Sequence, residues 1–285
     1  MAKVQVITDS TADIPKDLVK ELGISVVPLK VHLASESYLD GVNISSSEFY
    51  SRLKEIDQMP TTSQPSPSDF VEAYREAMEN GSTEILSIHL SSAFSGTYQS
   101  ATLAKSMVEG EINVTVLDSK TASYAIGTIV VAAAQAAQEG KSMDECVAVA
   151  RRVMESKEVY FLVDTLDYLQ KGGRIGKASA VVGSLLNIKP ILSINNDGEV
   201  YAVEKVRGKN KATARIFNIL KEKMPEGLEK AAVMYTDNRE EAEKWADRLR
   251  ETFGFEDVQF THIGPVIGAH TGPGTIAVVA VPVQP

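Results

Sequence analysis

The sequence predicts an α/β protein with two α/β domains, and three observations support this fold class. Strand-like runs alternate with helical runs through the first half, which is typical of a parallel sheet covered by helices. Two helical runs, 123–139 and 142–156, then follow each other without a strand between them. A second series of strand and helix patterns begins at Val159. We therefore expect an N-terminal α/β domain over 1–156 with a parallel sheet, and a C-terminal α/β domain over 157–285.

The first half contains four strand-like runs, at 3–9, 24–33, 84–90 and 113–118. Helix starts between them are well marked. Asp13, with a proline two residues later, is expected to open the first helix. Ser45 matches a capping box with a glutamate three residues on, and Ser66 precedes a first-turn proline. A further helix is expected to begin near Thr97.

The second half begins with the apolar run 159–163, which predicts a strand. A short helix, the turn 171–174 and a helical run to Leu186 follow. The sequence Asn196-Asp197-Gly198 predicts a hairpin between strands 190–194 and 200–206. Helix, strand, helix and strand come next, and Gly272-Pro273-Gly274 turns into a final strand at 275–281. Interfaces between two such domains commonly hold ligands, so we expect the site there.

Composition narrows the classes of function and location. A net charge of -9 argues against a broad nucleic-acid-binding face, because clustered Lys and Arg hold phosphate backbones. The most apolar stretch, 125–137, is too short to span a bilayer, so we expect no stable membrane insertion. The single Cys146 cannot form an internal disulfide, and a strand-like run begins at Lys3 with no secretory signal before it. We therefore expect a cytoplasmic protein.

Sequence signatures of nucleotide and metal sites are missing. No G-x-G-x-x-G follows the first strand, and Gly176-Lys177 lacks both the first glycine and the following hydroxyl of a phosphate loop. The four histidines have neither helical metal-binding spacing nor cysteine partners. We expect no cofactor and no metal site.

Three loops carry hydroxyls or glycines in unusual density. Ser91 to Thr97 lies between an apolar strand and a helix, where free N–H groups bind anions and where serine also serves as an ordinary N-cap. The loop 61–66 places Thr62 before another helix, and 263–274 surrounds His270 with four glycines. A binding loop and a plain turn both remain open for 263–274. The basic loops 171–174 and 205–209 fit a phosphate or an acidic partner surface, or simply solvated surface.

Ser95 and His270 also suggest a serine-dependent acyl hydrolase or transferase, with one as nucleophile and the other as base. However, Ser95 is not in a G-x-S-x-G turn, and the sequence identifies no carboxylate that would orient His270. This enzyme stays the alternative.

Taken together, five segments resemble the DegV family of fatty-acid-binding proteins, in the same order along the chain. They are 9–15 (DSTADIP), 62–66 (TSQPS), 91–98 (SSAFSGTY), 168–174 (YLQKGGR) and 270–274 (HTGPG). The resemblance implies two α/β domains that enclose one long-chain fatty acid. Thr62 and Ser95 would bind its carboxylate, and His270 would join that network.

The same resemblance implies a carrier with no catalytic residues of its own. A separate ATP-dependent fatty acid kinase would convert the bound lipid into acyl phosphate, with Arg174 and Arg207 contacting the partner or the phosphate. Phe94 departs from the leucine usual in relatives, which leaves the chain-length preference open.

Burial of the acyl chain would dominate the affinity for such a ligand. At about 0.8 kcal/mol per methylene, roughly fourteen methylenes supply on the order of 11 kcal/mol before entropy losses. The carboxylate is costly to bury unless several donors meet it. Candidate walls for the apolar tunnel are 159–169, 181–194 and 263–267.

Overall fold

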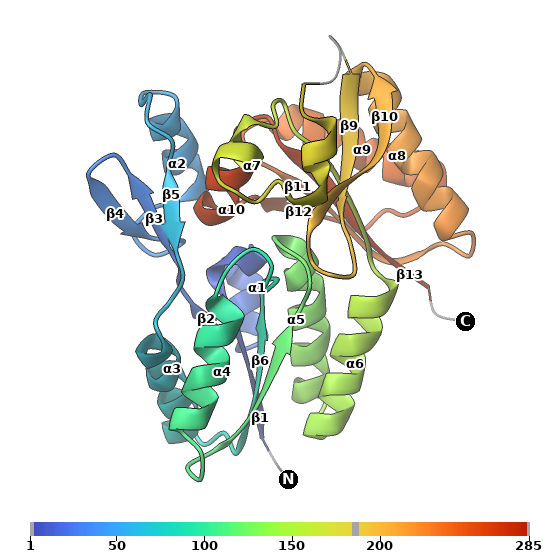
Figure 1. The fold of residues 1–285 in the computed structure, drawn as a ribbon. Helices are drawn as coiled ribbons and strands as arrows, with labels where there is room; N and C mark the ends of the chain where they lie inside the picture. The colour runs from blue at the N-terminus through green and yellow to red at the C-terminus, as the bar shows by residue number, and fades with distance from the viewer. Residues whose placement is uncertain (1–2, 184–187, 284–285) are drawn as a thin grey trace.

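The computed structural model describes residues 3–183 and 188–283, and it has the α/β architecture expected from the alternating pattern. Figure 1 shows the first half of the chain in blue to green, with most of its strands and helices in the lower part of the view and a smaller blue group at the upper left. The second half, in yellow to red, forms the upper right part around a second sheet.

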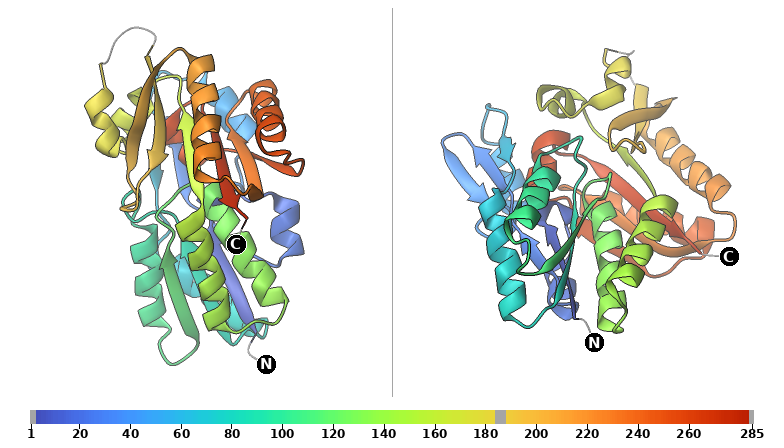
Figure 2. Two further views of the ribbon diagram at one scale, coloured as in Figure 1. Left: turned by 90° about the vertical axis from the view of Figure 1, so that its right-hand side faces the viewer. Right: turned by 60° about the horizontal axis from the view of Figure 1, so that its bottom comes forward.

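The first sheet is the expected parallel sheet. Its strands are β1 (Val4–Asp9), β2 (Ser25–Val27), β6 (Glu84–His89) and β7 (Asn113–Asp118), and its helices are α1 (Lys16–Glu21), α3 (Pro67–Glu79), α4 (Thr97–Met107), α5 (Tyr124–Gln138) and α6 (Met143–Ser156). The strand order is β2-β1-β6-β7, with every pairing parallel. Ile7 and Ile85 pack with α3 and α4, whereas Val6 and Leu86 pack with α5. Alternate side chains of each strand therefore supply two cores, as in a sheet covered on both faces (Figure 2).

The second sheet has six strands, all from the second half of the chain. They are β8 (Glu158–Leu162), β9 (Ile188–Ile194), β10 (Val200–Arg207), β11 (Leu228–Tyr235), β12 (Val258–His262) and β13 (Ile276–Pro282), in the order β10-β9-β8-β13-β11-β12. Helices α8 (Lys209–Lys223) and α9 (Arg239–Phe253) cover one face around the buried Trp245. The other face presents Phe161, Met234 and Ala277 to a separate apolar cluster. The boundary at 156/157 stays a prediction.

A third, small antiparallel sheet was not expected. It consists of β3 (Lys30–Leu33), β4 (Glu36–Leu39) and β5 (Thr61–Ser63), next to helix α2 (Ser46–Leu53). The expected single strand at 24–33 is therefore wrong, because its two halves join different sheets. Pro28, between them, has no N–H with which to continue the ladder. The expected loop at 61–66 begins as β5, in which Thr62 pairs with Val31.

Three further expectations differ from the structure. Asp13 does not open α1: it adopts a left-handed backbone with φ 50°, and Pro15 stands at the N-cap position. The glycine-rich segment 263–274 contains a short helix, α10 (Pro265–Thr271). After helix α7 (Asp167–Lys171), the expected helical run to Leu186 is a 3-10 helix over Gly176–Val181. Residues 184–187, part of that run and of the predicted wall 181–194, lie outside the described residues.

Candidate functional site

A cavity of about 790 Å³, including its open mouth, lies between the two halves of the chain. The loops after β6 and β7 contribute Leu90, Phe94 and Ala122, and α10 contributes Val266 and Ile267. The lining is mostly apolar, so the cavity suits an apolar ligand.

The second sheet forms one wall of this cavity. Ala277 on β13 pairs with Phe161 on β8 and with Met234 on β11, so the three form one row across the sheet. All three side chains line the cavity, and Val159 lines it from the next row. The small Ala277 between two larger side chains leaves room along the row. All three predicted walls contribute lining residues: 159–169, 263–267 and, through Ile194, the wall 181–194.

Thr62 and His270 meet at the polar part of the cavity, although 208 positions separate them in the sequence. Strand β5 carries Thr62, and α10 carries His270 in its last turn. Thr62 Oγ1 and His270 Nε2 are 2.8 Å apart, and both side chains line the cavity. The structure therefore brings together two of the three residues that the resemblance assigned to a carboxylate.

His270 is held in a dry environment. Burial, with a smaller contribution from the positive charge of Arg174, lowers the pKa of His270 to about 4. Its Nδ1 is buried and has no hydrogen-bond partner among the described residues. A Cβ atom on Gly172 would lie 2.4 Å from that Nδ1, so glycine is needed where α7 ends against the ring. The imidazole is therefore neutral near pH 7. It lines the cavity together with Thr62, to which it is hydrogen-bonded.

Ser95 lines the same cavity from the loop that precedes α4. Its Oγ lies 2.9 Å from Thr97 Oγ1 and accepts a hydrogen bond from the Thr97 N–H. Gly96, the N-cap residue of α4, offers no side chain for capping, so Ser95 satisfies part of the helix start. Capping and ligand binding are compatible here, because the hydroxyl has more than one hydrogen-bonding position. Ser91 serves the fold instead, donating to the Gly198 carbonyl at 2.9 Å.

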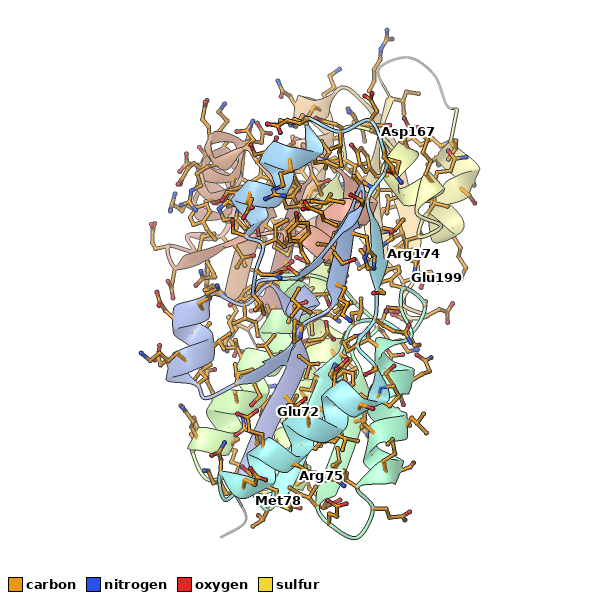
Figure 3. The ribbon with its side chains drawn as sticks, turned by 90° about the vertical axis from the view of Figure 1, so that its left-hand side faces the viewer. Glu72, Arg75, Met78, Asp167, Arg174 and Glu199 are labelled. Atoms are coloured by element: carbon orange, nitrogen blue, oxygen red, sulfur yellow. The ribbon has the colours of Figure 1, made fainter. Side chains whose placement is uncertain are left out.

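The two arginines that the resemblance grouped together lie in different places. Arg174 lines the cavity and fixes the loop of Ser95, because its Nε donates to the Phe94 carbonyl at 3.0 Å. A second donor of Arg174 binds the Gly172 carbonyl at 2.7 Å. Figure 3 shows Arg174 in the upper half of the molecule, well above Arg75 of α3. Arg207 is exposed at the end of β10 and is not among the residues that line the cavity.

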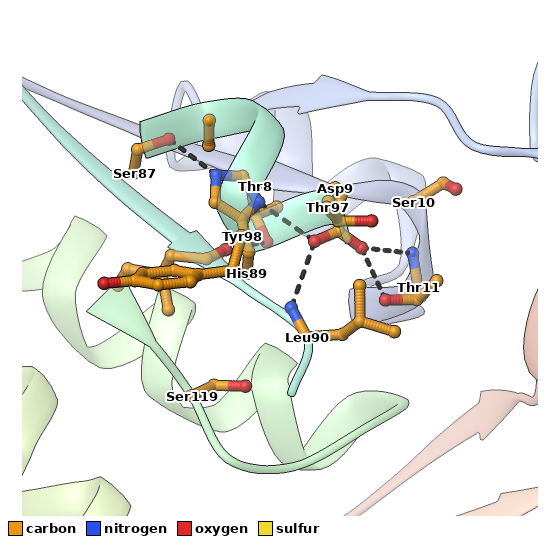
Figure 4. A network of polar contacts seen from close by, with 12 residues as sticks. Thr8, Asp9, Ser10, Thr11, Ser87, His89, Leu90, Thr97, Tyr98 and Ser119 are labelled. Atoms are coloured by element: carbon orange, nitrogen blue, oxygen red, sulfur yellow. Dashed lines mark hydrogen bonds and ion pairs between the residues drawn. The ribbon is translucent and has the colours of Figure 1, made fainter. Parts of the chain in front are cut away.

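A second histidine has the carboxylate partner that His270 lacks. His89 Nδ1 lies 2.9 Å from Asp9 Oδ2, and His89 Nε2 lies 2.6 Å from Ser87 Oγ (Figure 4). Tyr74 donates to the same Ser87 hydroxyl, and the side chains of Asp9, Ser87 and His89 are fully buried. This arrangement resembles a hydrolytic triad, but no substrate can reach it. It fills the crevice between β1 and β6, where the strand order reverses and nucleotides usually bind in such sheets.

The glycines of the segment 263–274 accommodate side chains of the same protein. A Cβ on Gly268 would lie 2.2 Å from the Tyr50 hydroxyl, and one on Gly272 would lie 2.4 Å from the Tyr168 ring. Gly264 and Gly274 approach Asp13 and Asp164 just as closely. Their density therefore reflects close packing of α10 against its neighbours. Sequence reasoning missed these contacts because each partner lies far away along the chain.

Within residues 3–183 and 188–283, no group of three or more His, Cys, Asp and Glu side chains is placed to hold a metal ion. In the same part of the chain, no helix is both long and apolar enough to cross a bilayer.

Comparison with known proteins identifies the family. A family model described as an uncharacterised protein of the DegV family matches residues 3–283. A DegV domain-containing protein of Halalkalibacterium halodurans is 42% identical over 277 residues, which is 97% of each chain. The structure of a DegV family protein from Thermus thermophilus, described as fatty-acid binding, has a TM-score of 0.89 at 38% identity and covers 99% of this chain and 100% of that one. DegV of Bacillus subtilis, described as a fatty acid binding protein, has a TM-score of 0.89 at 35% identity, with 99% and 100% covered. By sequence and by structure, this chain belongs to the DegV family.

Proposed function

We propose that this protein binds one long-chain fatty acid in the cavity, with the carboxylate at Thr62, Ser95 and His270 and the acyl chain along the apolar wall. The observation that carries the proposal is the Thr62–His270 hydrogen bond inside a cavity that is otherwise mainly apolar. Two structural relatives described as fatty-acid binding support the same ligand class.

The hydrogen-bond chemistry of Thr62 suits a carboxylate. A hydroxyl can accept one hydrogen bond and donate another. If His270 donates through Nε2–H to Thr62 Oγ1, the Thr62 O–H is free to donate to the ligand. The lowered pKa of His270 keeps the ring neutral, and a neutral imidazole carries a single proton. With that proton on Nε2, the Nδ1 atom beside Gly172 carries none. His270 then positions Thr62 and strengthens it as a donor.

Arg174 supplies the charge that neutral hydroxyls lack. Only part of its guanidinium is used on the carbonyls of Phe94 and Gly172. Its remaining N–H groups have no partner among the described residues, and the side chain lines the cavity. A nearby cation offsets part of the cost of burying a carboxylate. The arginine would also face a phosphoryl group attached to the same carboxylate.

The second part of the proposal is that a separate kinase phosphorylates the bound lipid. In that reaction a carboxylate oxygen attacks the γ-phosphorus of ATP, the bond to the bridging oxygen breaks, and acyl phosphate and ADP result. The carrier would supply orientation and charge, as is usual in phosphoryl transfer. We place no catalytic residue in this chain.

The geometry disfavours the alternative acyl hydrolase. A serine nucleophile needs a base with a pKa near the working pH and a group that orients it. His270 has a pKa of about 4, its Nε2 is hydrogen-bonded to Thr62, and its Nδ1 has no carboxylate partner among the described residues. Among the described residues, the histidine that has an orienting aspartate is His89, and it is sealed in the first sheet's core.

The proposal is tested by extracting the purified protein with organic solvent and identifying fatty acids by mass spectrometry. We expect close to one fatty acid per chain and no ester turnover by the intact protein. Lipid-free protein with robust ester hydrolysis would favour the hydrolase instead.

The site assignment is tested with the double variant Thr62→Ala, Ser95→Ala. It should lose most of its bound lipid while keeping its fold, because two hydroxyl donors to a buried carboxylate are worth about 1.5–3 kcal/mol each. The matched control is Thr61→Ala with Ser92→Ala, which removes neighbouring hydroxyls that do not line the cavity. Equal lipid content in the folded test variant and the control would refute the assignment.

A further inference from the structure

The start of α10 is held by two side chains from the first half of the chain. Asp13 Oδ1 accepts a hydrogen bond from the Gly264 N–H at 3.0 Å, and Tyr50 donates to the Ile263 carbonyl at 3.0 Å. The Asp40 carboxyl lies close by, with Oδ1 3.5 Å from the position that a Cβ on Gly264 would take. These contacts lie between residues more than 200 positions apart, and they join the two halves around the cavity. α10 is thereby fixed at the end opposite His270.

Asp13 is the centre of this arrangement. Its second oxygen accepts from the Ser123 hydroxyl, so one carboxylate joins the loop before α5 to the segment before α10. Ser123 and Val266 both line the cavity. A Cβ on Gly264 would lie 2.5 Å from Asp13 Oδ1, so the close approach requires glycine there. The sequence around Asp13 is thus built for a contact with α10, whereas it was expected only to begin a helix.

The backbone at this contact is strained on one side of the cavity. Asp13 has φ 50° and Ser123 has φ 54° with ψ -152°, which are two of the four positive-φ residues other than glycine in the described chain. Such conformations cost on the order of 1–3 kcal/mol each and persist where surrounding contacts determine them. Burial and the nearby Asp40 charge also raise the pKa of Asp13 well above its ordinary value. A strained backbone and a poorly solvated carboxyl both reduce the stability of the folded state, which is not expected of a contact without a function.

We propose that Asp13 is a positioning residue that latches α10 against the first half of the chain, and so sets how fast the lipid leaves the cavity. This inference rests on the proposed fatty-acid function. Helix α10 carries Val266, Ile267, His270 and Thr271, which form both apolar and polar lining. Helix α10 is in contact with β3 and β5, and its separation from them would open the cavity wider for the ligand to leave. Breaking the Asp13–Gly264 contact begins that separation.

The decisive variant is Asp13→Gly, because glycine suits the left-handed backbone and the loss is then that of the carboxyl alone. The protein is loaded with cis-parinaric acid, and release into excess phosphatidylcholine vesicles is followed by stopped-flow fluorescence. We expect release about tenfold faster than in the wild type, the size expected for losing one buried hydrogen bond. Asp13→Asn should restore slow release, because its amide can accept from Gly264 and donate to Ser123.

Two controls separate the latch from a general loss of stability. Ala34→Gly changes another left-handed residue, and Glu145→Ala removes a carboxylate that also accepts one backbone N–H and one serine hydroxyl. Both should release lipid at the wild-type rate. Wild-type release by folded Asp13→Gly overturns the latch.

A readout that needs no ligand distinguishes failure of the latch from failure of the proposed function. Amide hydrogen exchange at Gly264 and Val266 should be faster in lipid-free Asp13→Gly, while amides of β1 and β6 stay protected. If the wild type binds no fatty acid, the proposed function fails, and exchange at these two amides still decides the latch. Should Asp13→Gly not fold, Ser123→Gly is tested instead, because it removes the hydrogen bond from the Ser123 hydroxyl to Asp13. Unchanged exchange at both amides overturns the inference.

Discussion

His270 and His89 show how the same side chain acquires opposite properties from its neighbours. His89 lies between Asp9 and Ser87 in a sealed core, whereas His270 has a hydroxyl on one nitrogen and no partner among the described residues on the other. The sequence picked out His270 through the glycines around it, but it could not locate the carboxylate of His89. Asp9 and His89 are 80 positions apart, and only the pairing of β1 with β6 brings them together.

Acidification should destabilise the protein through His270. The pKa of His270 is about 4 in the folded state against about 6.5 for an unperturbed histidine, so the unfolded chain binds more protons between these two values. The stabilisation from the neutral ring is therefore complete above pH 6.5 and is lost as the pH falls toward 4. The full difference is about 3 kcal/mol. Urea unfolding of lipid-free protein between pH 7 and pH 4.5 should show this loss, and His270→Gln should reduce it.

The control for this prediction is Thr62→Ala, which removes the hydrogen-bond partner but leaves the imidazole in place. It should retain the sensitivity to acid. Parallel pH dependences for the wild type and His270→Gln would contradict the assignment.

At the level of elements, the long amphipathic helices could be predicted and the short strands could not. Helix α6 begins at the capping box of Ser142 and Glu145, and α3 begins at that of Ser66 and Asp69, so local sequence determines both starts. Strands β4 and β5 have four and three residues, too few for a periodic pattern, and they are ordered by pairing with β3. The short helix α10 could not be predicted, because its glycines lower the helix propensity of the segment. The need for these glycines becomes clear only from the side chains that pack against them.

The contact between α7 and α10 gives a test at this scale. Of the two adjacent glycines there, one is required by close packing and the other by its left-handed backbone. Gly172 has an ordinary φ of -73°, but a Cβ there would lie 2.4 Å from His270 Nδ1 and 2.8 Å from the Tyr168 carbonyl. Gly172→Ala should therefore displace the imidazole, cost about 1–3 kcal/mol in stability and weaken lipid retention. Unfolding and lipid content are both measured.

The matched control is Gly173→Ala. Gly173 has φ +71°, and its Cβ would meet nothing within 4 Å. Alanine there should cost about 1–2 kcal/mol from the left-handed backbone alone and leave lipid retention unchanged. If both variants lose lipid equally, stability rather than the position of His270 explains the loss.

At the scale of the whole molecule, the cavity exists only where the two halves meet. Thr62 and Ser95 come from the first half, Arg174 and His270 from the second, and no local pattern connects them. The residues themselves indicated hydroxyl-rich loops, and the family resemblance assigned them to one ligand. Neither the sequence pattern nor the resemblance could predict that Arg174 and Arg207 lie far apart, because their separation depends on how far β10 extends from the cavity. Val200 lines the cavity at the start of that strand, and Arg207 lies seven residues further on, roughly 20 Å away.

Arg207 therefore belongs to a surface that a partner protein can reach while the lipid stays enclosed. The chain has a net charge of -9, yet this corner holds Lys205, Arg207, Lys209 and Lys211, of which Lys209 pairs with Glu241 at 3.6 Å. Gly208 provides no side-chain cap for α8, and the first turn contains no acidic residue. The helix dipole thus adds to the local positive charge, which suits an acidic partner surface.

Arg207→Ala should leave bound lipid and stability unchanged but slow acyl-phosphate formation with a fatty acid kinase from the same organism. We expect a decrease of about tenfold at low salt, corresponding to about 1.4 kcal/mol of partner interaction. Added salt should slow the wild type toward the variant, because exposed charges are screened. Arg152→Ala, which removes an exposed arginine on α6, is the control and should react at the wild-type rate. Lipid content is measured first, so that a full rate in lipid-loaded Arg207→Ala would remove Arg207 from the kinase contact without touching the assignment of the cavity.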